Sequence, residues 1–229
     1  MHTSIPNRPA LPYLPFRRIS LPTAGWAVAL GMALVLPASY AIHHLLPLPG
    51  ASAIQVAAKA KLLAATPMWL LALKSLLIYP VLEECIYRGV ILQMLRRYLP
   101  LWAALLPPTV LFGVTHLGSS PANAVFAALA GLYFAWLAIR SGSLLTAILC
   151  HSAVNLFVVF LLPFAVRLLG PRDAAAAPIT LAHPLLLALL AVSFAVLVAG
   201  TRKLRSGFRH PAAPVGATTA AAVPNAVAA

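Results

Sequence analysis

The chain has 229 residues, of which 62% are hydrophobic and 8% are charged, and its mean hydropathy is +0.95. Soluble domains carry about 25% charged residues, so this composition excludes an ordinary soluble domain and predicts an integral membrane protein. The formal net charge of +13 raises the question of nucleic-acid binding. The sequence argues against that class, because it has neither a basic stretch interleaved with aromatic residues nor a glycine-rich phosphate loop.

Six apolar segments are long enough for transmembrane helices, because about 20 helical residues cross a hydrocarbon core about 30 Å thick. In chain order they cover residues 22–46, 67–95, 101–117, 121–139, 143–166 and 180–200. We therefore predict an all-α fold, a polytopic transmembrane bundle of about six helices. We expect a multi-pass protein of the cell (inner or plasma) membrane.

These segments leave little chain for a second folded unit. We assign residues 1–21 to a cytoplasmic N-terminal segment and residues 22–205 to one transmembrane domain, with a motif core at 67–166. Residues 206–229 are rich in Ala, Pro and Thr and lack apolar periodicity, which predicts a disordered tail.

The basic residues are distributed unevenly over the predicted loops. Ten lie on the side of the N-terminus: Arg8, Arg17, Arg18, Arg96, Arg97, Arg140, Arg202, Lys203, Arg205 and Arg209. Four lie on the other side: Lys59, Lys61, Arg167 and Arg172. The positive-inside rule therefore predicts both termini in the cytoplasm, with the basic excess facing anionic lipid headgroups.

Two of the three acidic residues, Glu83 and Glu84, are neighbours inside the second apolar segment. An ionised carboxylate at membrane depth is unfavourable by several kcal/mol unless it faces a partner or water, so an intramembrane acid is a candidate for a functional site. Arg88 follows Glu84 by one helical turn on the same face, and we expect these two to form an ion pair. Glu83 is then left unpaired.

Two further motifs place polar side chains one helical turn apart. Phe112 and His116 share a face at the end of the third segment, and His151 and Asn155 share a face in the fifth. Each motif alone has a structural explanation, as an ion pair between helices, a helix cap or an interhelical hydrogen bond. Their combination favours a site, because the chain otherwise places almost no polar residues in its apolar segments.

This set of residues suits water activation. Glu83 would deprotonate a water molecule, with an imidazole on the other side of that water. Asn155 and the second imidazole would donate hydrogen bonds to the oxyanion of a tetrahedral intermediate, where one donor is worth about 3 kcal/mol. The predicted reaction is amide hydrolysis within the membrane.

The three motifs, Glu-Glu-x-x-x-Arg at 83–88, Phe-x-x-x-His at 112–116 and His-x-x-x-Asn at 151–155, resemble the CAAX-processing and bacteriocin-processing (CPBP, or Abi) family of intramembrane proteases. The resemblance covers about residues 67–166. It implies that Glu83 and His116 activate water and that His151 and Asn155 line the oxyanion site.

The resemblance also implies supporting roles and a shape. Glu84 and Arg88 would support the catalytic carboxylate through their ion pair, and Phe112 would support His116 from the same helical face. Six or more transmembrane helices would surround a wet cavity.

Metal dependence stays open at this point. Two imidazoles and one carboxylate also match a catalytic zinc site with an open position for water, and its ligands would be Glu83, His116 and His151. The sequence has no His-Glu-x-x-His motif. We favour the metal-independent glutamate mechanism, without a cofactor, over the zinc alternative.

Three functions are compatible with these residues. The leading hypothesis is an intramembrane endopeptidase whose partners are the lipid bilayer and a membrane-anchored substrate, such as a C-terminal sorting tag, a leader peptide or a bacteriocin-like peptide. The alternatives are a non-cleaving immunity or scaffold protein of the same fold and a small proton-coupled transporter with a Glu/His relay. An inverted repeat would favour the transporter, and the sequence shows none that is convincing.

The segment boundaries conflict with the motifs at one point. They place His116 near the outer end of the third segment, whereas Glu83 and His151 lie deeper in theirs. One water molecule cannot serve groups at such different depths. We therefore expect either that the helix ends earlier or that Pro107 and Pro108 interrupt it.

Overall fold

The structure is a helical bundle, a computed structural model that describes residue 14, residues 16–164 and residues 184–207. In chain order the elements are α1 (Leu21–Leu45), α2 (Ala53–Ala65), α3 (Met68–Leu73), η1 (Lys74–Ile78), α4 (Tyr79–Glu84), η2 (Cys85–Ile91), α5 (Leu92–Leu95), α6 (Leu101–Val114), α7 (Pro121–Ser141), α8 (Leu144–Leu156), η3 (Phe157–Leu161) and α10 (Pro184–Gly207). The η elements are π-helical. No β-strand occurs in the described ranges, and the predicted all-α fold is confirmed.

Several of these helices have the length and apolarity of membrane spans. Four stretches qualify outright: Leu21–Ile42, Pro121–Ser141, Leu144–Phe164 and Leu187–Leu204. The continuous helix Met68–Leu95, formed by α3 to α5, follows α2 at a bend of 114° and is counted as a fifth span when the two are taken together. Four or five candidate spans agree roughly with the six that the sequence predicts.

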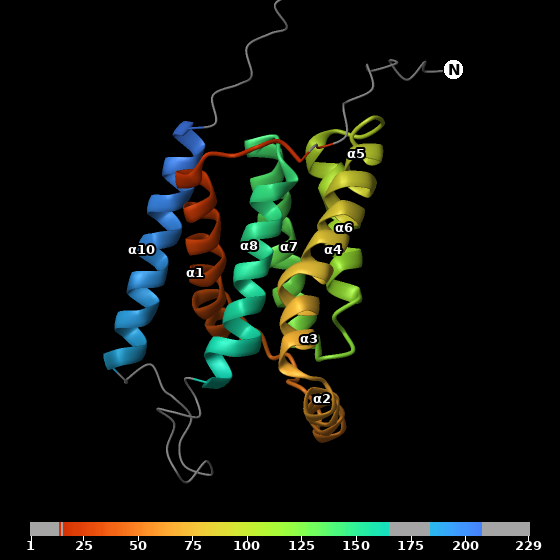
Figure 1. Ribbon diagram of the computed structural model, residues 1–229, viewed down its shortest axis with the longest axis vertical. Coiled ribbons are helices and arrows are strands. Elements are labelled where there is room, and N and C mark those ends of the chain that lie inside the picture. Colours follow the sequence, from red (N-terminus) through yellow and green to blue (C-terminus); the bar gives the residue numbers. More distant parts are fainter. Residues whose placement is uncertain (1–13, 15, 165–183, 208–229) are drawn as a thin grey trace, which may run out of the picture.

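Helix α8 lies inside the bundle, where it packs against α1, α7 and α4 (Figure 1). Gly31 of α1 approaches α8 so closely that a Cβ atom would overlap the Cys150 carbonyl. Small residues allow this close approach of backbones in membrane bundles. The buried cluster at the centre includes Phe112 of α6 and Phe134 of α7, both of which contact the candidate site.

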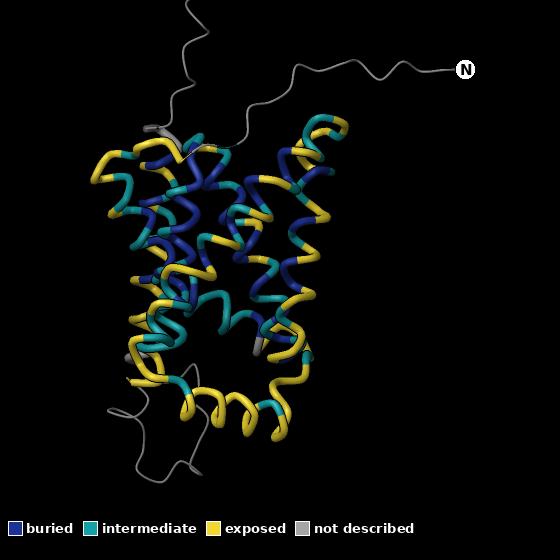
Figure 2. Tube along the Cα trace, turned by 45° about the vertical axis from the view of Figure 1, so that its right-hand side comes forward, coloured by how far each residue is buried: buried dark blue, intermediate teal, exposed yellow. Residues whose placement is uncertain are grey.

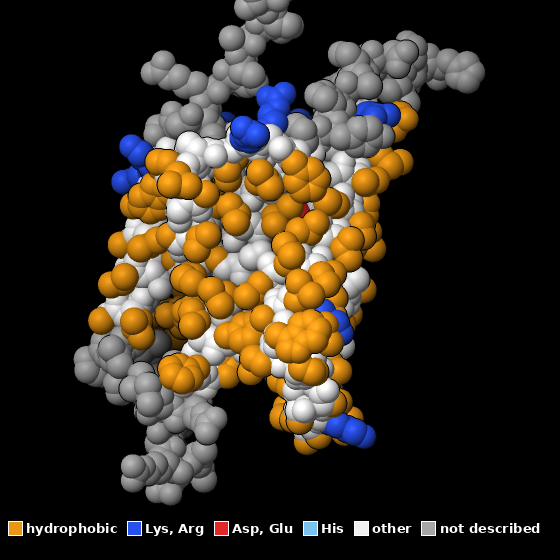
Figure 3. Space-filling model, in the orientation of Figure 1, with side chains coloured by type: hydrophobic (Ala, Val, Ile, Leu, Met, Phe, Trp, Pro, Cys, Tyr) orange, Lys and Arg blue, Asp and Glu red, His pale blue; other side chains and the backbone are white. Residues whose placement is uncertain are grey.

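Both ends of the described bundle lie on the same side. Helix α1 begins and α10 finishes at one end, which we call the basic end (Figure 1). Its described cations, next to or within the helix ends, are Arg17, Arg18, Arg96, Arg97, Arg140, Arg202 and Lys203. Most of the Lys and Arg side chains visible in Figure 3 gather there. This arrangement matches the predicted common side of the first and last helix ends, and their placement in the cytoplasm stays a prediction from the positive-inside rule.

The third predicted span is shorter than expected. Helix α6 has 14 residues, or about 21 Å at 1.5 Å per residue, which is less than a hydrocarbon core. Pro107 and Pro108 lie inside it without interrupting it, so the expected break is wrong and the earlier end is right. Because α6 ends at Val114, His116 lies in the turn that follows the helix, where it is half-buried.

The sequence-based prediction also missed α2. Residues 53–65 were expected to form an outer loop, because they are too short and too polar for a span. Ser52 and Gln55 form a capping box at the helix start, and the Ala-rich sequence that follows favours a helix. Most of the predicted segments 1–21 and 206–229, together with Arg167 and Arg172, lie outside the described residues.

Candidate active site

The two neighbouring glutamates have different surroundings. Glu84 is completely buried, whereas 31% of the Glu83 side chain is exposed. Both lie in the last turn of α4, directly before the π-helical η2. Glu83 can therefore meet water or a substrate, and Glu84 can act only on protein groups. π-helical turns inside α-helices are frequent at functional sites.

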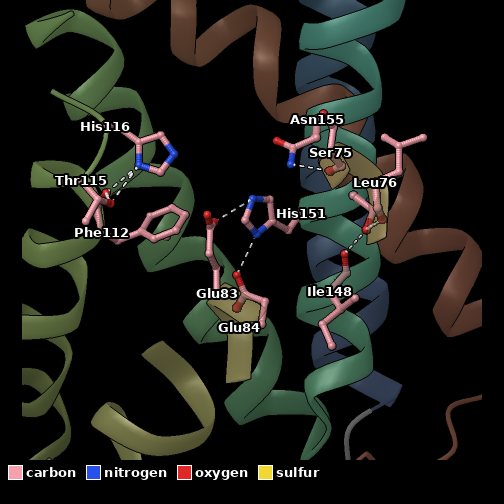
Figure 4. Close-up of polar contacts among 12 residues, drawn as sticks. Ser75, Leu76, Glu83, Glu84, Phe112, Thr115, His116, Ile148, His151 and Asn155 are labelled. Carbon is pink, nitrogen blue, oxygen red and sulfur yellow. Dashed lines mark hydrogen bonds and ion pairs between the residues drawn. The ribbon is translucent and has the colours of Figure 1, made fainter. Parts of the chain in front are cut away.

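Glu84 holds two partners on one oxygen. Its Oε1 accepts a hydrogen bond from Arg88 Nη1 at 2.8 Å and lies 3.0 Å from His151 Nδ1 (Figure 4). The predicted ion pair between Glu84 and Arg88 is therefore present, and Arg88 is as deeply buried as its partner. A buried carboxylate and guanidinium compensate each other's lost hydration.

Arg88 connects this pair to α7. Its Nη2 donates to the Gly131 carbonyl at 2.7 Å, and its guanidinium carbon lies 4.7 Å from the centroid of the Phe112 ring. A Cβ at position 131 would lie 2.6 Å from Arg88 Nη2 and 2.8 Å from Phe112 Cδ1. Only glycine leaves room for the guanidinium here.

The imidazole of His151 is fixed by two aromatic rings and a carboxylate. Its ring stacks on Phe134, with centroids 4.8 Å apart and planes at 19°, and meets Phe112 edge-on at 5.7 Å. Because Glu84 Oε1 already accepts a hydrogen bond from Arg88, it acts toward His151 Nδ1 as an acceptor, which assigns a proton to Nδ1. Nε2 then points toward Glu83, whose Oε2 lies 3.6 Å away.

His116 reaches the site from the turn after α6. Its Nδ1 lies 2.8 Å from the Phe112 carbonyl oxygen, which can only accept, so this nitrogen carries the proton and Nε2 is left free. The His116 ring lies 4.8 Å from the Phe112 ring, which also contacts His151. His116 and Glu83 do not form an ion pair among the described residues.

Asn155 lies one turn beyond His151 on α8. Its Nδ2 donates to the Ser75 carbonyl at 2.8 Å, and the neighbouring Ser152 hydroxyl donates to the Leu76 carbonyl at 2.8 Å. Both carbonyls belong to η1, where the π-helical turn disturbs the regular hydrogen-bond pattern. One N–H of the Asn155 amide is thus engaged by the backbone, and its second N–H is the one available to a ligand.

The proposed zinc ligands do not form a metal site as the residues are placed. In the described part of the chain, no three His, Cys, Asp or Glu side chains converge to hold a metal ion. Glu83 and His151 approach each other, but His116 stays more than an ion-pair distance from Glu83.

The structure places most of the predicted site residues close together and adds neighbours that the sequence did not indicate. Glu83, Glu84, Arg88, Phe112, His116 and His151 form one cluster, with Asn155 at its edge (Figure 4). Gly131, Phe134 and Ser152 were not predicted. A glycine at the centre of an apolar helix is the one signal that pointed to Gly131, and Phe134 is one aromatic residue among many.

The fold and this cluster define a helical membrane protein with a carboxylate and imidazole site inside the bundle. Residues 64–157 match the family model described as Type II CAAX prenyl endopeptidase Rce1-like. The matched segment contains all three motifs, and the resemblance to the CPBP proteases is confirmed. The match supports an intramembrane endopeptidase of the CAAX type. Neither the curated proteins nor the solved structures contain a match to this chain.

Proposed function

We propose that this protein is an intramembrane endopeptidase that hydrolyses a peptide bond of a membrane-anchored protein or peptide with water activated by Glu83. One observation carries the proposal. The accessible Glu83 carboxylate lies 3.6 Å from His151 Nε2, while the other ring nitrogen, Nδ1, contacts the buried Glu84. A reactive carboxylate, a positioned imidazole and a buried charge that orients it are the parts of a general-base site.

In the proposed reaction, Glu83 removes a proton from a water molecule whose oxygen adds to the carbonyl carbon of the peptide bond. The carbonyl oxygen becomes an oxyanion, and the carbon–nitrogen bond then breaks as the nitrogen takes up the proton from Glu83. The Nε2 atom of His116 receives a hydrogen bond from the water on its other side. This assignment keeps Glu83 and His116 as the water-activating pair.

His151 and Asn155 would stabilise the oxyanion. With both ring nitrogens protonated, His151 donates from Nε2, and the Glu84 carboxylate at 3.0 Å from Nδ1 stabilises the imidazolium. The second N–H of Asn155 is the other donor.

The direction of access favours a substrate within the bilayer. Leu82 of α4 and Ile86 of η2, which lie on either side of the two glutamates along the chain, are both exposed. Figure 3 shows a small acidic patch between hydrophobic side chains on the flank of the bundle, and Glu84 is completely buried. A CAAX prenyl substrate, as the description of the matched family names it, is the first class to test.

The experiment compares peptide termini of membrane and secreted proteins from cells that carry the wild-type protein or Glu83→Gln at equal abundance. Leu82→Val, a change on the exposed face next to the site, is the matched control. Termini that disappear with Glu83→Gln and persist with Leu82→Val would identify substrate and cleavage site together. If the set of peptide termini is unchanged although Glu83→Gln is folded and the cells that carry it still show a phenotype, the non-cleaving scaffold or the transporter is favoured.

A further inference from the structure

Helix α2 is unusual because it buries none of its residues. It lies across the end of the bundle opposite the basic end, at 114° to the helix Met68–Leu95 (Figures 1 and 2). Ile54 and Leu62 are 82% and 66% exposed, and Val56 and Leu63 are exposed as well. Thirteen residues are too few to cross a bilayer. A short helix with exposed large apolar side chains at the end of a membrane bundle suits the interface between headgroups and acyl chains.

The charge of α2 is not balanced by any of the described residues. Lys59 and Lys61 are exposed and have no acidic partner among the described residues. The only described acidic side chains are Glu83 and Glu84, and both belong to the site. Among the described residues, the two lysines of α2 are therefore available to an external anion. Anionic phospholipid headgroups would offer one at the depth where an interfacial helix lies.

One side chain ties α2 to the turn that follows His116. Gln55 Nε2 donates to the Gly118 carbonyl at 3.0 Å, while Gln55 Oε1 accepts from the Ser52 backbone N–H at 2.8 Å. The same residue thus completes the helix cap and fastens the α6–α7 turn. A shift of α2 would be transmitted to this turn.

We propose that α2 is a lipid-binding interfacial helix: Lys59 and Lys61 bind the headgroups of anionic phospholipids, and Gln55 couples this binding to the turn that carries His116. The partner is a lipid surface of negative charge, recognised by two cations and by the exposed apolar side chains of a helix that buries none of its residues. The proposal does not depend on what the site catalyses.

The test uses the full chain in nanodiscs of phosphatidylcholine with or without phosphatidylglycerol, and it measures hydrogen exchange of the α2 peptide and retained lipid by native mass spectrometry. We expect phosphatidylglycerol to slow exchange in α2. The double variant Lys59→Gln/Lys61→Gln should weaken the retention of phosphatidylglycerol about 30-fold, since each Lys raises the affinity for an anionic surface by about a factor of five. Lys59→Arg/Lys61→Arg, which keeps the charge, should behave as wild type.

A second variant separates the coupling from the binding. Glu at position 55 keeps the cap, because its carboxylate still accepts from the Ser52 N–H, but it cannot donate to the Gly118 carbonyl. With Gln55→Glu, phosphatidylglycerol should still slow exchange in α2 but no longer in residues 115–120. Equal exchange of wild-type α2 in both lipids would overturn the proposal. A second result would also overturn the proposal. If exchange in α2 slows in phosphatidylcholine discs, and only when a peptide with a free C-terminal carboxylate is added, the two cations contact a substrate and not a lipid.

Discussion

His151 Nδ1 lies 3.0 Å from Oε1 of Glu84, a carboxylate without any exposed surface. Because of this contact, the two adjacent glutamates have different roles. Glu84 fixes the tautomer and direction of the imidazole, and Glu83 meets that imidazole from the accessible side. A carboxylate behind a histidine is a common way to orient it. Changes at the two glutamates should therefore have different consequences.

Glu83→Gln should reduce peptidase activity by about 10²–10⁴-fold, the usual contribution of a general base. The amide keeps the shape of the side chain, and 31% of Glu83 is exposed, so the melting temperature should stay close to that of the wild type. Activity assays on the identified substrate, with thermal unfolding in detergent, test both parts. A variant that keeps its activity would contradict the assignment of Glu83 as the base.

Glu84→Gln should affect stability as well as activity. The amide leaves the buried guanidinium of Arg88 without its counter-charge, and breaking one side of a buried pair typically lowers the free energy of unfolding by about 3–5 kcal/mol. Thermal unfolding of this variant beside Glu83→Gln provides the comparison. Equal melting temperatures for the two would show that the pair contributes little to the fold.

Gly131→Ala should disturb Arg88 directly, because a Cβ there would lie 2.6 Å from Arg88 Nη2 and 2.8 Å from Phe112 Cδ1. Overpacking of this kind lowers stability by about 1–3 kcal/mol, although alanine by itself favours a helix over glycine by about 1 kcal/mol. Activity should fall too, since the guanidinium holds Glu84.

Gly25→Ala is the matched control for that change. Gly25 also lies within a helix, α1, but nothing lies within 4 Å of the Cβ it would receive. We expect this variant to be as stable as the wild type or slightly more stable in the same unfolding assay. A loss of stability equal to that of Gly131→Ala would mean that crowding around Arg88 is not the cause.

The sequence was sufficient for those parts of the site that follow from helical spacing. Glu84 and Arg88, like Phe112 and His116, are four residues apart, and both pairs are in contact. Contacts between helices were beyond this reasoning, since no spacing rule indicates that His151 meets Glu84. The packing of Phe134 on His151 depends on how α7 and α8 are positioned.

Helix length was the other limit. The hydropathy-based third segment extended to Leu117, whereas the structure ends the helix at Val114. The motifs indicated the depth of His116 better than hydropathy did, because a shared site requires its members to be close. Helix α2 escaped notice because its helical signals are local and its apolar stretch is short.

Metal chelation addresses the mechanism that the sequence left open. Both histidines have Nδ1 directed at an oxygen acceptor, Glu84 Oε1 for His151 and the Phe112 carbonyl for His116, so each offers only Nε2 to a ligand. A catalytic zinc requires three protein donors at about 2.0–2.2 Å, and no such trio converges in the described residues. We therefore expect peptidase activity to survive dialysis against EDTA and 1,10-phenanthroline, and the active protein to contain less than one zinc per chain by plasma mass spectrometry.

The control is Glu83→Gln, which should be inactive with or without added zinc. Activity that disappears on chelation and returns with zinc in the wild-type protein would replace the glutamate mechanism with a metal-dependent one, and Glu83, His116 and His151 would then have to move together to bind the ion.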